Sequence, residues 1–318
     1  MSSKLTEAMH VMAGVLVDEQ GRVLLAQRPP GKHLAGLWEF PGGKLEAAEA
    51  PLDGLMRELH EELGIEASVA DPLIQVRWRY GDRDLRLDAW MVRHWQGQPA
   101  SLEGQALQWC MPVQVDLTQL APADRPILRA LQLPPCCSIT PADVPPESFA
   151  AWRERLMQAM VAGERLLLLR FPLWPAERVR ELAAALQPMA RKYGAQLLLS
   201  GDVDGARELG EGVGVQLKAQ QLMPLCERPL PFTQWVGASC HDATELAHAH
   251  QLADFATLSP VAPTATHPGA TPLGWPRFQS LVAQASLPVY ALGGMSPADK
   301  EAARQAGGQG VAGIRGFW

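Results

Sequence analysis

The sequence predicts an α/β protein of two domains, residues 1–133 and residues 134–318, of which the second is a (β/α)₈ barrel. The length of 318 residues suggests about two domains. Proline at positions 134 and 135 fixes an extended connection, which marks the boundary. Beyond it, eight short apolar strands alternate with helical stretches, a pattern typical of a barrel whose site lies at the C-terminal strand ends.

The first domain begins with a hairpin pattern. Residues 10–18 are rich in β-formers, Gln20-Gly21 predicts a turn, and residues 22–27 return as a second strand. A basic loop over residues 28–33 follows, and its turn residues alone favour a solvated turn. Three further strands are expected after the central helix, at residues 73–80, 85–94 and 106–111.

The helix expected over residues 51–63 carries the chemistry of the first domain. Pro51 suits the first turn, and Gly64 suits the left-handed residue just past the end. One face is an apolar stripe and the neighbouring arc is acidic: Leu52, Leu55, Met56, Leu59 and Leu63, then Glu58, Glu61 and Glu62. Like charges this close to the negative end of the helix dipole repel unless a cation binds there. The alternative is a solvated acidic face, the usual meaning of a Glu pair on a helix.

The segment before this helix favours the metal interpretation. Pro41-Gly42-Gly43 can turn sharply and approach a ligand closely, and Lys44 places a cation beside it. Hard carboxylate oxygens suit Mg²⁺ or Mn²⁺, which keep waters and bridge to substrate phosphates.

The same residues carry a resemblance. Gly43, Glu49 and the run from Arg57 to Ile65 match every defined position of the Nudix box, so this part resembles the Nudix hydrolases. The resemblance implies an α/β/α sandwich with a mixed sheet, and hydrolysis of nucleoside diphosphates linked to another group with Mg²⁺ or Mn²⁺. Arg57 and Glu49 would hold the loop to the helix. The implied metal-binding residues are Glu58, Glu61, Glu62, Gly42 and Glu103, and the implied catalytic residues are Glu61, Glu103 and Arg57.

Residues 10–132 are similar to the MutT-type members, which remove oxidised guanine nucleotides such as 8-oxo-dGTP, giving the monophosphate and pyrophosphate. This implies a role in nucleotide pool sanitation and DNA repair. Arg28 and Lys44 would contact phosphates, and Arg83 and Asp124 would contact the base. The bacterial enzymes have Asn in place of Asp124. Because an ionised Asp only accepts hydrogen bonds, another base tautomer, another oxidised purine or another diphosphate stays open.

The second domain resembles thiamine-phosphate synthase and its regulator-like relatives, through Ser138-Ile139-Thr140-Pro141 and Leu292-Gly293-Gly294 among other stretches. Gly293 and Gly294 fit a phosphate cradle, with a tight turn as the alternative. The strands are expected at residues 136–140, 165–171, 196–200, 213–217, 233–239, 254–259, 288–292 and 310–314, and the helices at 148–161, 176–193, 242–252, 275–285 and 297–306.

The barrel departs from the synthases where they bind metal and pyrophosphate. Where the synthases have an Asn-Asp pair, this chain has Ser200-Gly201. Gln216 stands in place of a histidine, Gln221 in place of an acid and His267 in place of a lysine, whereas an arginine of the synthases is kept as Arg170. We therefore expect either a barrel that binds a phosphate ligand, with a phosphorylated thiazole or thiamine as the candidate, or a degenerate barrel, and in both cases no synthase activity.

Two other functions stay open at this point. The first domain could hydrolyse a thiamine-related diphosphate while the barrel binds a pathway intermediate. Alternatively, the chain could be a bifunctional or sensor protein, in which a phosphorylated vitamin precursor in the barrel alters hydrolysis.

Composition sets the remaining expectations. A net charge of −6 argues against binding a nucleic-acid polymer, which needs a basic surface, but permits a free nucleotide. No apolar run reaches membrane-spanning length. The five cysteines form no C-x-x-C pair, so a reduced, cytoplasmic protein without structural zinc is expected.

Overall fold

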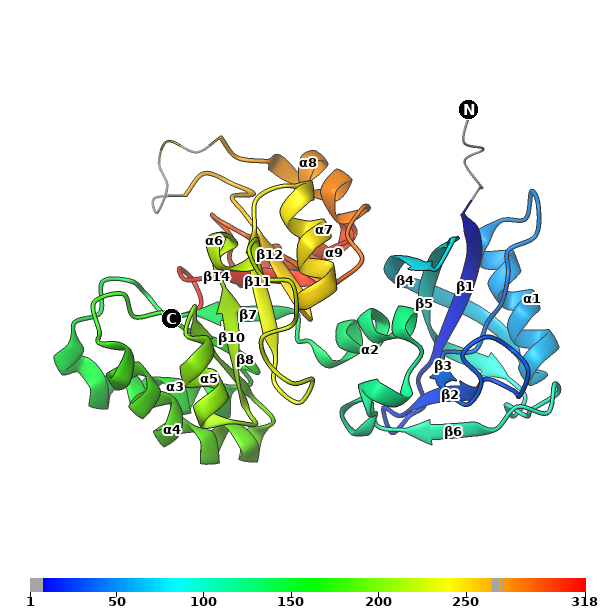
Figure 1. Cartoon of the computed structure of the whole chain (residues 1–318), viewed down its shortest axis with the longest axis horizontal. Coiled ribbons are helices and arrows are strands. Elements are labelled where there is room, and N and C mark those ends of the chain that lie inside the picture. The colour runs from blue at the N-terminus through cyan, green and yellow to red at the C-terminus, as the bar shows by residue number, and fades with distance from the viewer. Residues whose placement is uncertain (1–7, 265–268, 270) are drawn as a thin grey trace. The chain divides into compact units, whose positions relative to one another are not determined.

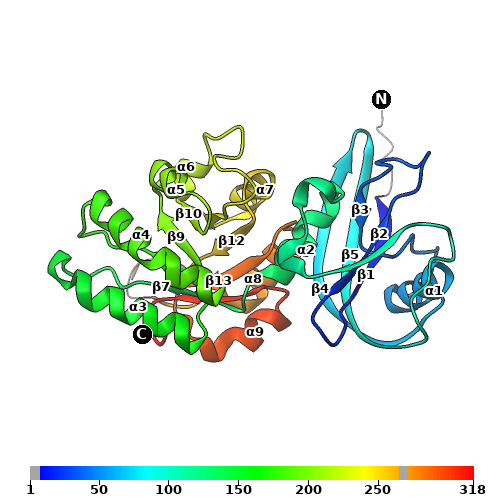
Figure 2. The ribbon, with the colours of Figure 1, turned by 90° about the horizontal axis from the view of Figure 1, so that it is seen from below.

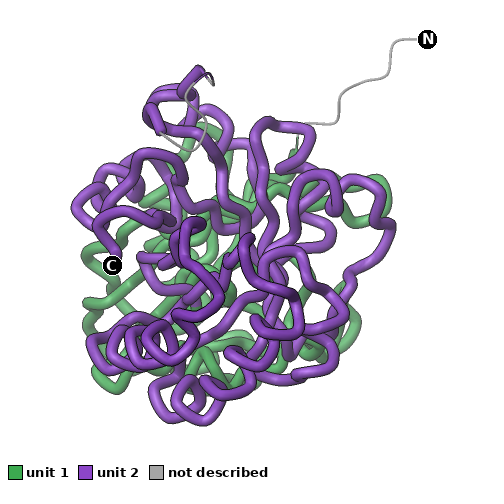
Figure 3. Tube along the Cα trace, turned by 90° about the vertical axis from the view of Figure 1, so that its left-hand side faces the viewer, with its two compact units in different colours: residues 1–132 green, residues 133–318 purple. Residues whose placement is uncertain are grey.

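The computed structural model describes residues 8–264, 269 and 271–318. Contacts between Cα atoms divide the chain into two compact units, residues 1–132 and 133–318, which Figure 3 colours separately. The expected boundary between residues 133 and 134 stays a prediction about how the chain folds in solution. No helix among the described residues is both long enough and apolar enough to cross a bilayer.

The N-terminal unit contains a mixed sheet, as expected. Its order is β1-β5-β4, with β1 parallel to β5 and β4 antiparallel to β5. A second sheet, of order β3-β2-β6, is antiparallel. The strands are β1 (Met9–Leu16), β2 (Val23–Gln27), β3 (Trp38–Glu39), β4 (Glu66–Tyr80), β5 (Arg83–Gln96) and β6 (Leu107–Cys110).

The hairpin predicted for the first two strands is wrong. Both strands form, but only the bridge between Val17 and Val23 joins them. β1 bonds β5 along one edge. Along the other edge its backbone bonds residues 41–45, since Met12 N donates to Gly43 O at 2.8 Å and Gly14 N donates to Pro41 O at 2.7 Å. The segment 41–45 thus lies along the edge of β1 where β2 was expected, and β2 pairs with β3 and β6 instead.

Two helices, α1 (Pro51–Leu63) and α2 (Arg125–Gln132), cover the two faces of the mixed sheet (Figure 1). Side chains alternate along β1, so Met12 and Leu16 pack in one cluster with Leu55, Leu59 and Leu63 of α1. Ala13 and Val15 pack in another cluster with Ile127 and Leu128 of α2. Each fully buried leucine contributes about 2 kcal/mol. The α/β/α sandwich is thereby confirmed.

The helix prediction is confirmed with one correction. α1 ends at Leu63, and Gly64 just past the end is left-handed with a φ of 68°. Leu52 was expected in the apolar stripe but is exposed. Near the start of the helix the core is filled by Leu45, whose Cδ1 lies 2.5 Å from where a Cβ on Gly54 would be. Three short 3-10 helices precede α2: η1 (Pro112–Gln114), η2 (Leu117–Gln119) and η3 (Pro122–Asp124).

The C-terminal unit is a closed barrel of eight parallel strands, which confirms the prediction. Side chains at alternate positions, such as Leu166, Leu168 and Phe255, fill the interior, and the intervening ones pack outward in a second cluster with the helices. Figure 2 shows helices of this unit beside its strands. The strands are β7 (Cys136–Ile139), β8 (Leu166–Leu169), β9 (Gln196–Ser200), β10 (Val213–Leu217), β11 (Val236–Cys240), β12 (Phe255–Leu258), β13 (Val289–Leu292) and β14 (Gly310–Gly313).

The helices of the barrel include the five expected ones and two short additions, α5 and α6. The additions were missed because each is at most two turns long, too short for a clear hydrophobic period. His267 lies outside the described residues. The helices are α3 (Phe149–Ala162), α4 (Ala176–Tyr193), α5 (Val203–Leu209), α6 (Ala219–Leu222), α7 (Ala243–Leu252), α8 (Gly274–Val282) and α9 (Lys300–Gln305), with η4 (Pro146–Ser148) and η5 (Pro297–Asp299).

Candidate functional site

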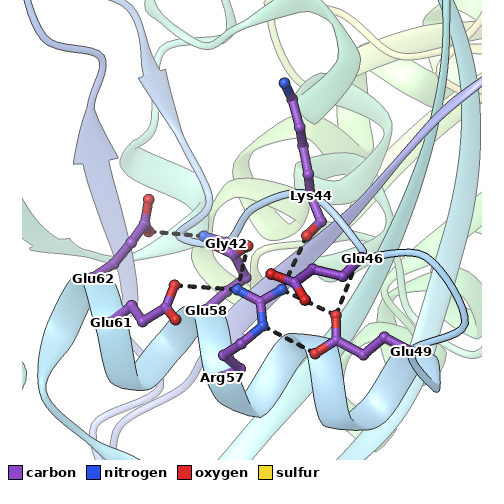
Figure 4. A network of polar contacts seen from close by, with 8 residues as sticks. All are labelled: Gly42, Lys44, Glu46, Glu49, Arg57, Glu58, Glu61 and Glu62. Carbon is purple, nitrogen blue, oxygen red and sulfur yellow. Dashed lines mark hydrogen bonds and ion pairs between the residues drawn. The ribbon is translucent and has the colours of Figure 1, made fainter.

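Arg57 of α1 ties the loop before the helix to the acidic side of the helix (Figure 4). Its Nε and Nη2 donate to the two carboxylate oxygens of Glu49 at 2.9 and 3.0 Å. Its Nη1 donates to Glu58 at 2.9 Å and to Glu61 at 3.1 Å, and Nη2 also donates to Lys44 O at 3.1 Å. These bonds hold the pKa of Glu49 below its usual value and raise that of Arg57. The protein thus supplies one cation to the helix itself.

Glu62 lies on the other side of this acidic cluster. Its Oε2 accepts a hydrogen bond from Gly42 N at 3.0 Å. Burial raises the pKa of Glu62 to about 7, the Gly42 N–H opposes that rise, and the nearby charges of Glu103, Glu39 and Glu58 add to it. Four carboxyl groups therefore lie near one another, and among the described residues all except Glu62 are paired with a cation, namely Arg57, Arg28 or Lys32. Hard oxygen donors of this kind fit a divalent cation such as Mg²⁺ or Mn²⁺.

Two glycines let these groups come together. A Cβ on Gly43 would lie 2.0 Å from Oε2 of Glu58, so glycine is needed for the carboxylate to rest against the backbone. A Cβ on Gly42 would lie 2.1 Å from Met12 O, so the close pairing with β1 requires glycine there. The two glycines that were expected to form a sharp turn therefore allow the Glu58 carboxylate and strand β1 to lie directly against this segment.

The carboxylates are not drawn around one point. In the part of the chain that the structure describes, no group of three His, Cys, Asp or Glu side chains is placed to hold a metal ion. Glu58 and Glu61 accept hydrogen bonds from Arg57. Glu103, in the loop after β5, forms an ion pair with Lys32, with 3.7 Å between Nζ and Oε2. The metal set of Gly42, Glu58, Glu61, Glu62 and Glu103 stays a prediction.

Glu39 of β3 is a member of the site that the sequence did not single out. The Arg28 guanidinium, expected at a substrate phosphate, forms an ion pair with Glu39 and donates from Nε to His33 O at 2.7 Å. Burial raises the pKa of Glu39, and Arg28 and Lys32 partly offset the rise. An acid between Trp38 and Phe40, three residues before Gly42, is the signal that could have identified it.

The two predicted base contacts lie in the same unit. Asp124, at the end of η3, is only 6% exposed, and its Oδ1 accepts a hydrogen bond from Phe40 N at 3.0 Å. Arg83 is exposed at the start of β5, directly across from Tyr80 in the β4–β5 pair. The Tyr80 hydroxyl accepts a hydrogen bond from Ala123 N at 3.0 Å, which brings this turn to the segment that carries Asp124.

Lys44 contributes its carbonyl oxygen to the cluster and not its charge. Its side chain is exposed and extends away from Arg57 in Figure 4. The predicted phosphate contacts, Arg28 and Lys44, therefore differ in one respect: Arg28 is already paired with a carboxylate, whereas the Lys44 ammonium faces solvent.

The glycine pair of the barrel is accounted for by packing. Gly293 and Gly294 have φ values of 92° and 70°, and a Cβ on Gly294 would lie 2.7 Å from Pro263 O. Val261 N donates to Leu292 O at 2.9 Å, which holds the two loops together. This fits the tight-turn alternative, and a phosphate-binding role for the pair stays a prediction.

The C-terminal unit contains two buried polar atoms without a partner among the described residues, Gln216 Oε1 on β10 and Arg170 Nη1 just after β8. Gln216 is 3% exposed, and its Nε2 donates to Ser239 Oγ at 3.2 Å and Thr257 Oγ1 at 3.3 Å. Because a buried unpaired polar atom costs about 1–3 kcal/mol, a ligand that bonds these atoms would stabilise the barrel.

Comparison with known proteins finds a matching family for each of the two units. Residues 12–130 match the family model described as NUDIX domain, and residues 136–317 match the one described as thiamine monophosphate synthase. CTP pyrophosphohydrolase of Escherichia coli (strain K12) is 43% identical over 119 residues, which cover 37% of this chain and 88% of that protein. The 8-oxo-dGTP diphosphatase of the same strain is 31% identical over 124 residues, covering 39% and 96%.

The barrel has relatives of its own. The putative thiamine-phosphate synthase 2 of Aquifex aeolicus (strain VF5) is 30% identical over 188 residues, which cover 59% of this chain and 99% of that protein. The chain therefore belongs to two families, with a Nudix hydrolase domain in its N-terminal unit and a member of the thiamine monophosphate synthase family in its C-terminal unit.

Proposed function

We propose that the N-terminal unit is a metal-dependent pyrophosphohydrolase of nucleoside triphosphates, above all oxidised purine forms such as 8-oxo-dGTP, which it converts to the monophosphate and pyrophosphate. The observation that carries the proposal is the group of carboxyls around the Gly42-Gly43 segment, where burial and mutual repulsion raise the pKa of Glu62 to about 7. The names of the relatives, an 8-oxo-dGTP diphosphatase and a CTP pyrophosphohydrolase, support the reaction class.

The acidic residues of the site would bind the metal and the attacking water. Glu58, Glu61, Glu62 and Glu103 would hold Mg²⁺ or Mn²⁺, with Gly42 fixing Glu62. The bound metal would polarise the phosphates and lower the pKa of an attacking water. The side chains of Glu61 and Glu103 keep 55% and 50% of their surface exposed, so both can reach a water at the substrate. Arg57 positions the helix against the loop.

Substrate binding uses the cations and the base contacts. Lys44, which is exposed, would offset charge on the phosphates, and Arg28 would do so by sharing its guanidinium with Glu39. Arg83 and Asp124 would face the base. The proposal places the reaction in the cytoplasm, in keeping with five cysteines that are all free thiols.

The test is hydrolysis by the full chain with Mg²⁺, with Glu61→Gln as the blank. Pyrophosphate release is measured from 8-oxo-dGTP, dGTP and CTP, and phosphate release from thiamine pyrophosphate. Preference for 8-oxo-dGTP supports the proposal. Preference for CTP keeps the reaction but changes the substrate. Faster cleavage of thiamine pyrophosphate would support a hydrolase of thiamine-related diphosphates instead.

For the barrel we propose a binding function, for a phosphorylated thiazole or thiamine ligand, without synthase activity. The unpaired Gln216 Oε1 and Arg170 Nη1 favour a ligand, while Ser200, Gly201 and Gln221 replace the groups that the synthases use for metal and pyrophosphate. Calorimetric titration with thiazole phosphate and with thiamine phosphate tests binding. A sensor requires that the bound ligand alters nucleotide hydrolysis, so equal rates with and without thiazole phosphate would count against that reading.

A further inference from the structure

A lysine follows β10 at the C-terminal strand ends, where barrels of this kind hold their ligands. Lys218 is exposed and keeps an extended backbone, with a φ of −76° and a ψ of 153°. Because side chains alternate along an extended chain, Lys218 is directed to the same side as Gln216, which bonds Ser239 and Thr257 of the next two strands. Among the described residues Lys218 forms no ion pair, so no carboxylate there neutralises its charge.

Gly201, at the end of the neighbouring strand β9, makes room for this lysine. β9 pairs in parallel with β10, and Gly201 directly follows Ser200, which is the partner of Gln216. The φ of Gly201 is 74°, and a Cβ there would lie 3.3 Å from Cε of Lys218 and 2.8 Å from Oε1 of Gln221. The end of the lysine side chain therefore lies against the backbone at the end of β9.

The residues at this place do not fit a divalent metal. Where the synthases have Asn-Asp, this chain has Ser200-Gly201, which offers no carboxylate. The amide of Gln221 is used by the backbone, since Nε2 donates to the glycine carbonyl oxygen at 2.8 Å and Oε1 accepts from Lys218 N at 3.2 Å. Asp202, the next residue of the chain, accepts hydrogen bonds from Arg180 at both carboxylate oxygens, at 2.7 and 2.8 Å. The lysine ammonium would also repel Mg²⁺, which prefers carboxylate oxygens and water.

Arg170 supplies a second positive charge at the same end of the barrel. It directly follows β8, the strand on the other side of β9, and Leu168, two residues before it, points into the barrel interior. Its Nη1 is buried without a hydrogen-bond partner in the part of the chain that the structure describes, and no ion pair of Arg170 occurs there. Strands two apart in a sheet lie about 10 Å from each other, so one anion can meet the side chains of both Arg170 and Lys218. Phosphate suits both, because a guanidinium binds it bidentately and an ammonium binds it as a point charge.

We propose that the barrel binds the phosphate group of its ligand without a divalent metal, with Lys218 in the place of the metal and Arg170 beside it. The inference rests on the proposed binding of a phosphorylated ligand by the barrel and specifies how the charge of that ligand is met. Two cations match the charge of about −1.5 to −2 that a phosphate monoester carries at pH 7. Binding by the barrel is therefore independent of Mg²⁺, in contrast to the hydrolysis proposed for the N-terminal unit.

The test is calorimetric titration of the full chain with thiazole phosphate and with thiamine phosphate, once with Mg²⁺ and once with EDTA. We expect the same Kd in both buffers. Lys218→Met should weaken binding by about 10-fold or more, because it removes a charged contact to the phosphate, whereas Lys218→Arg keeps the charge and should restore most of the affinity. Lys192→Met is the matched control and should bind like the wild type, since Lys192 is exposed near the end of α4, which leads into the start of β9 at the opposite end of the barrel.

The outcomes separate this inference from the binding function on which it rests. Binding that requires Mg²⁺ would overturn the inference and leave the binding function standing, and so would equal affinity in Lys218→Met and the wild type. If neither ligand is bound in either buffer, both proposals are overturned. If Lys218→Met does not fold, the comparison of the two buffers in the wild type decides.

Discussion

Asp124 and Glu62 are held by backbone N–H groups two residues apart, those of Phe40 and Gly42. Pro41 O and Gly43 O bond β1 on the opposite side of this segment, so both carboxyls lie on its other edge. Since an extended chain advances about 3.3 Å per residue, the two N–H groups are about 7 Å apart. The predicted base contact and the predicted metal ligand are therefore positioned by one short segment, and the spacing between them is fixed by the backbone.

Glu61→Gln should abolish nucleotide hydrolysis while leaving the fold intact. The Glu61 side chain is half exposed, and the hydrogen bond that it accepts from Arg57 can also be accepted by an amide oxygen, so stability should hardly change. Loss of the charge should reduce kcat by about 1000-fold or more. Asp53→Asn, an exposed carboxyl on the same helix, is the matched control and should keep wild-type rates. A folded Glu61→Gln enzyme with normal turnover would sink the assignment.

Gly43→Ala should reduce activity far more than stability. The added methyl would meet the carboxylate end of Glu58, a flexible group that can move aside, but moving it displaces a predicted metal ligand. We expect kcat/KM to fall by about 100-fold, with a larger requirement for Mg²⁺. Gly21→Ala is the contrasting variant, which should lose stability but keep activity. Its φ of 77° is strained for alanine, while no atom lies near the added methyl. Activity retained in Gly43→Ala at wild-type Mg²⁺ would contradict the placement of Glu58.

Arg57→Lys should destabilise the N-terminal unit. Lysine cannot donate at once to both oxygens of Glu49, to Glu58, to Glu61 and to Lys44 O. We expect the melting temperature of that unit to fall by several degrees, followed by circular dichroism and intrinsic fluorescence. Arg79→Lys is the control, because the contacts of Arg79 are exposed: an ion pair with Asp84 at 3.5 Å and a hydrogen bond from Nε to Gly81 O at 3.2 Å. Equal melting temperatures for the two variants would show that the Arg57 network adds nothing.

Asp124→Asn should stabilise the protein increasingly as the pH rises. The folded-state pKa of about 8 lies above the ordinary value of 3.8, so unfolding releases a proton between these limits. Wild-type stability is therefore greatest near pH 4 and is lost as the pH rises toward 8, by on the order of a few kcal/mol. Asn does not titrate. Urea unfolding at pH 5 and pH 8 measures the change, and a difference between variant and wild type that does not vary with pH would argue that Asp124 is ionised throughout.

Residues 134–318 expressed alone should fold and should form no thiamine phosphate. The closed barrel has its own buried core, so circular dichroism and a cooperative melt should match those of the full chain. The pyrimidine pyrophosphate and thiazole phosphate are supplied with Mg²⁺. Product above the level of a heat-denatured blank would refute the loss of synthase activity, and an unfolded fragment would move the domain boundary.

The fold was predictable wherever one element carries its own pattern. The period and end residues of α1, and the alternation of strands and helices in the barrel, are local properties. The partner of β1 was not predictable, because the turn at Gln20-Gly21 predicts a hairpin whereas pairing is decided by which edges other segments fill. Leu52 fits the helical period but is 37% exposed in the first turn of the helix, where the period alone does not show that the apolar stripe extends beyond the core.

The candidate site was predictable as a set of residue types, not as a set of contacts. The run from Arg57 to Glu62 gave the acids, but the sequence could not indicate that Arg57 Nη1 would bond Glu58 and Glu61. Glu39 was missed because its closeness to Glu62 and Asp124 arises from a strand, a helix and a 3-10 helix that are separated in the chain. The charge state of Asp124 depends on burial, which a residue type alone does not reveal.

The pairing of residues 41–45 with β1 has a consequence for solubility. β1 is the outermost strand of its sheet, and an uncovered outer strand offers unpaired N–H and C=O groups to another molecule. Here Met12 N, Gly14 N and His10 O are already bonded to the loop. The segment that presents Gly42 and Gly43 therefore also protects the molecule against strand addition. Substitutions that detach residues 41–45 from β1 should yield protein that aggregates. Loss of activity and loss of solubility would then have the same structural cause.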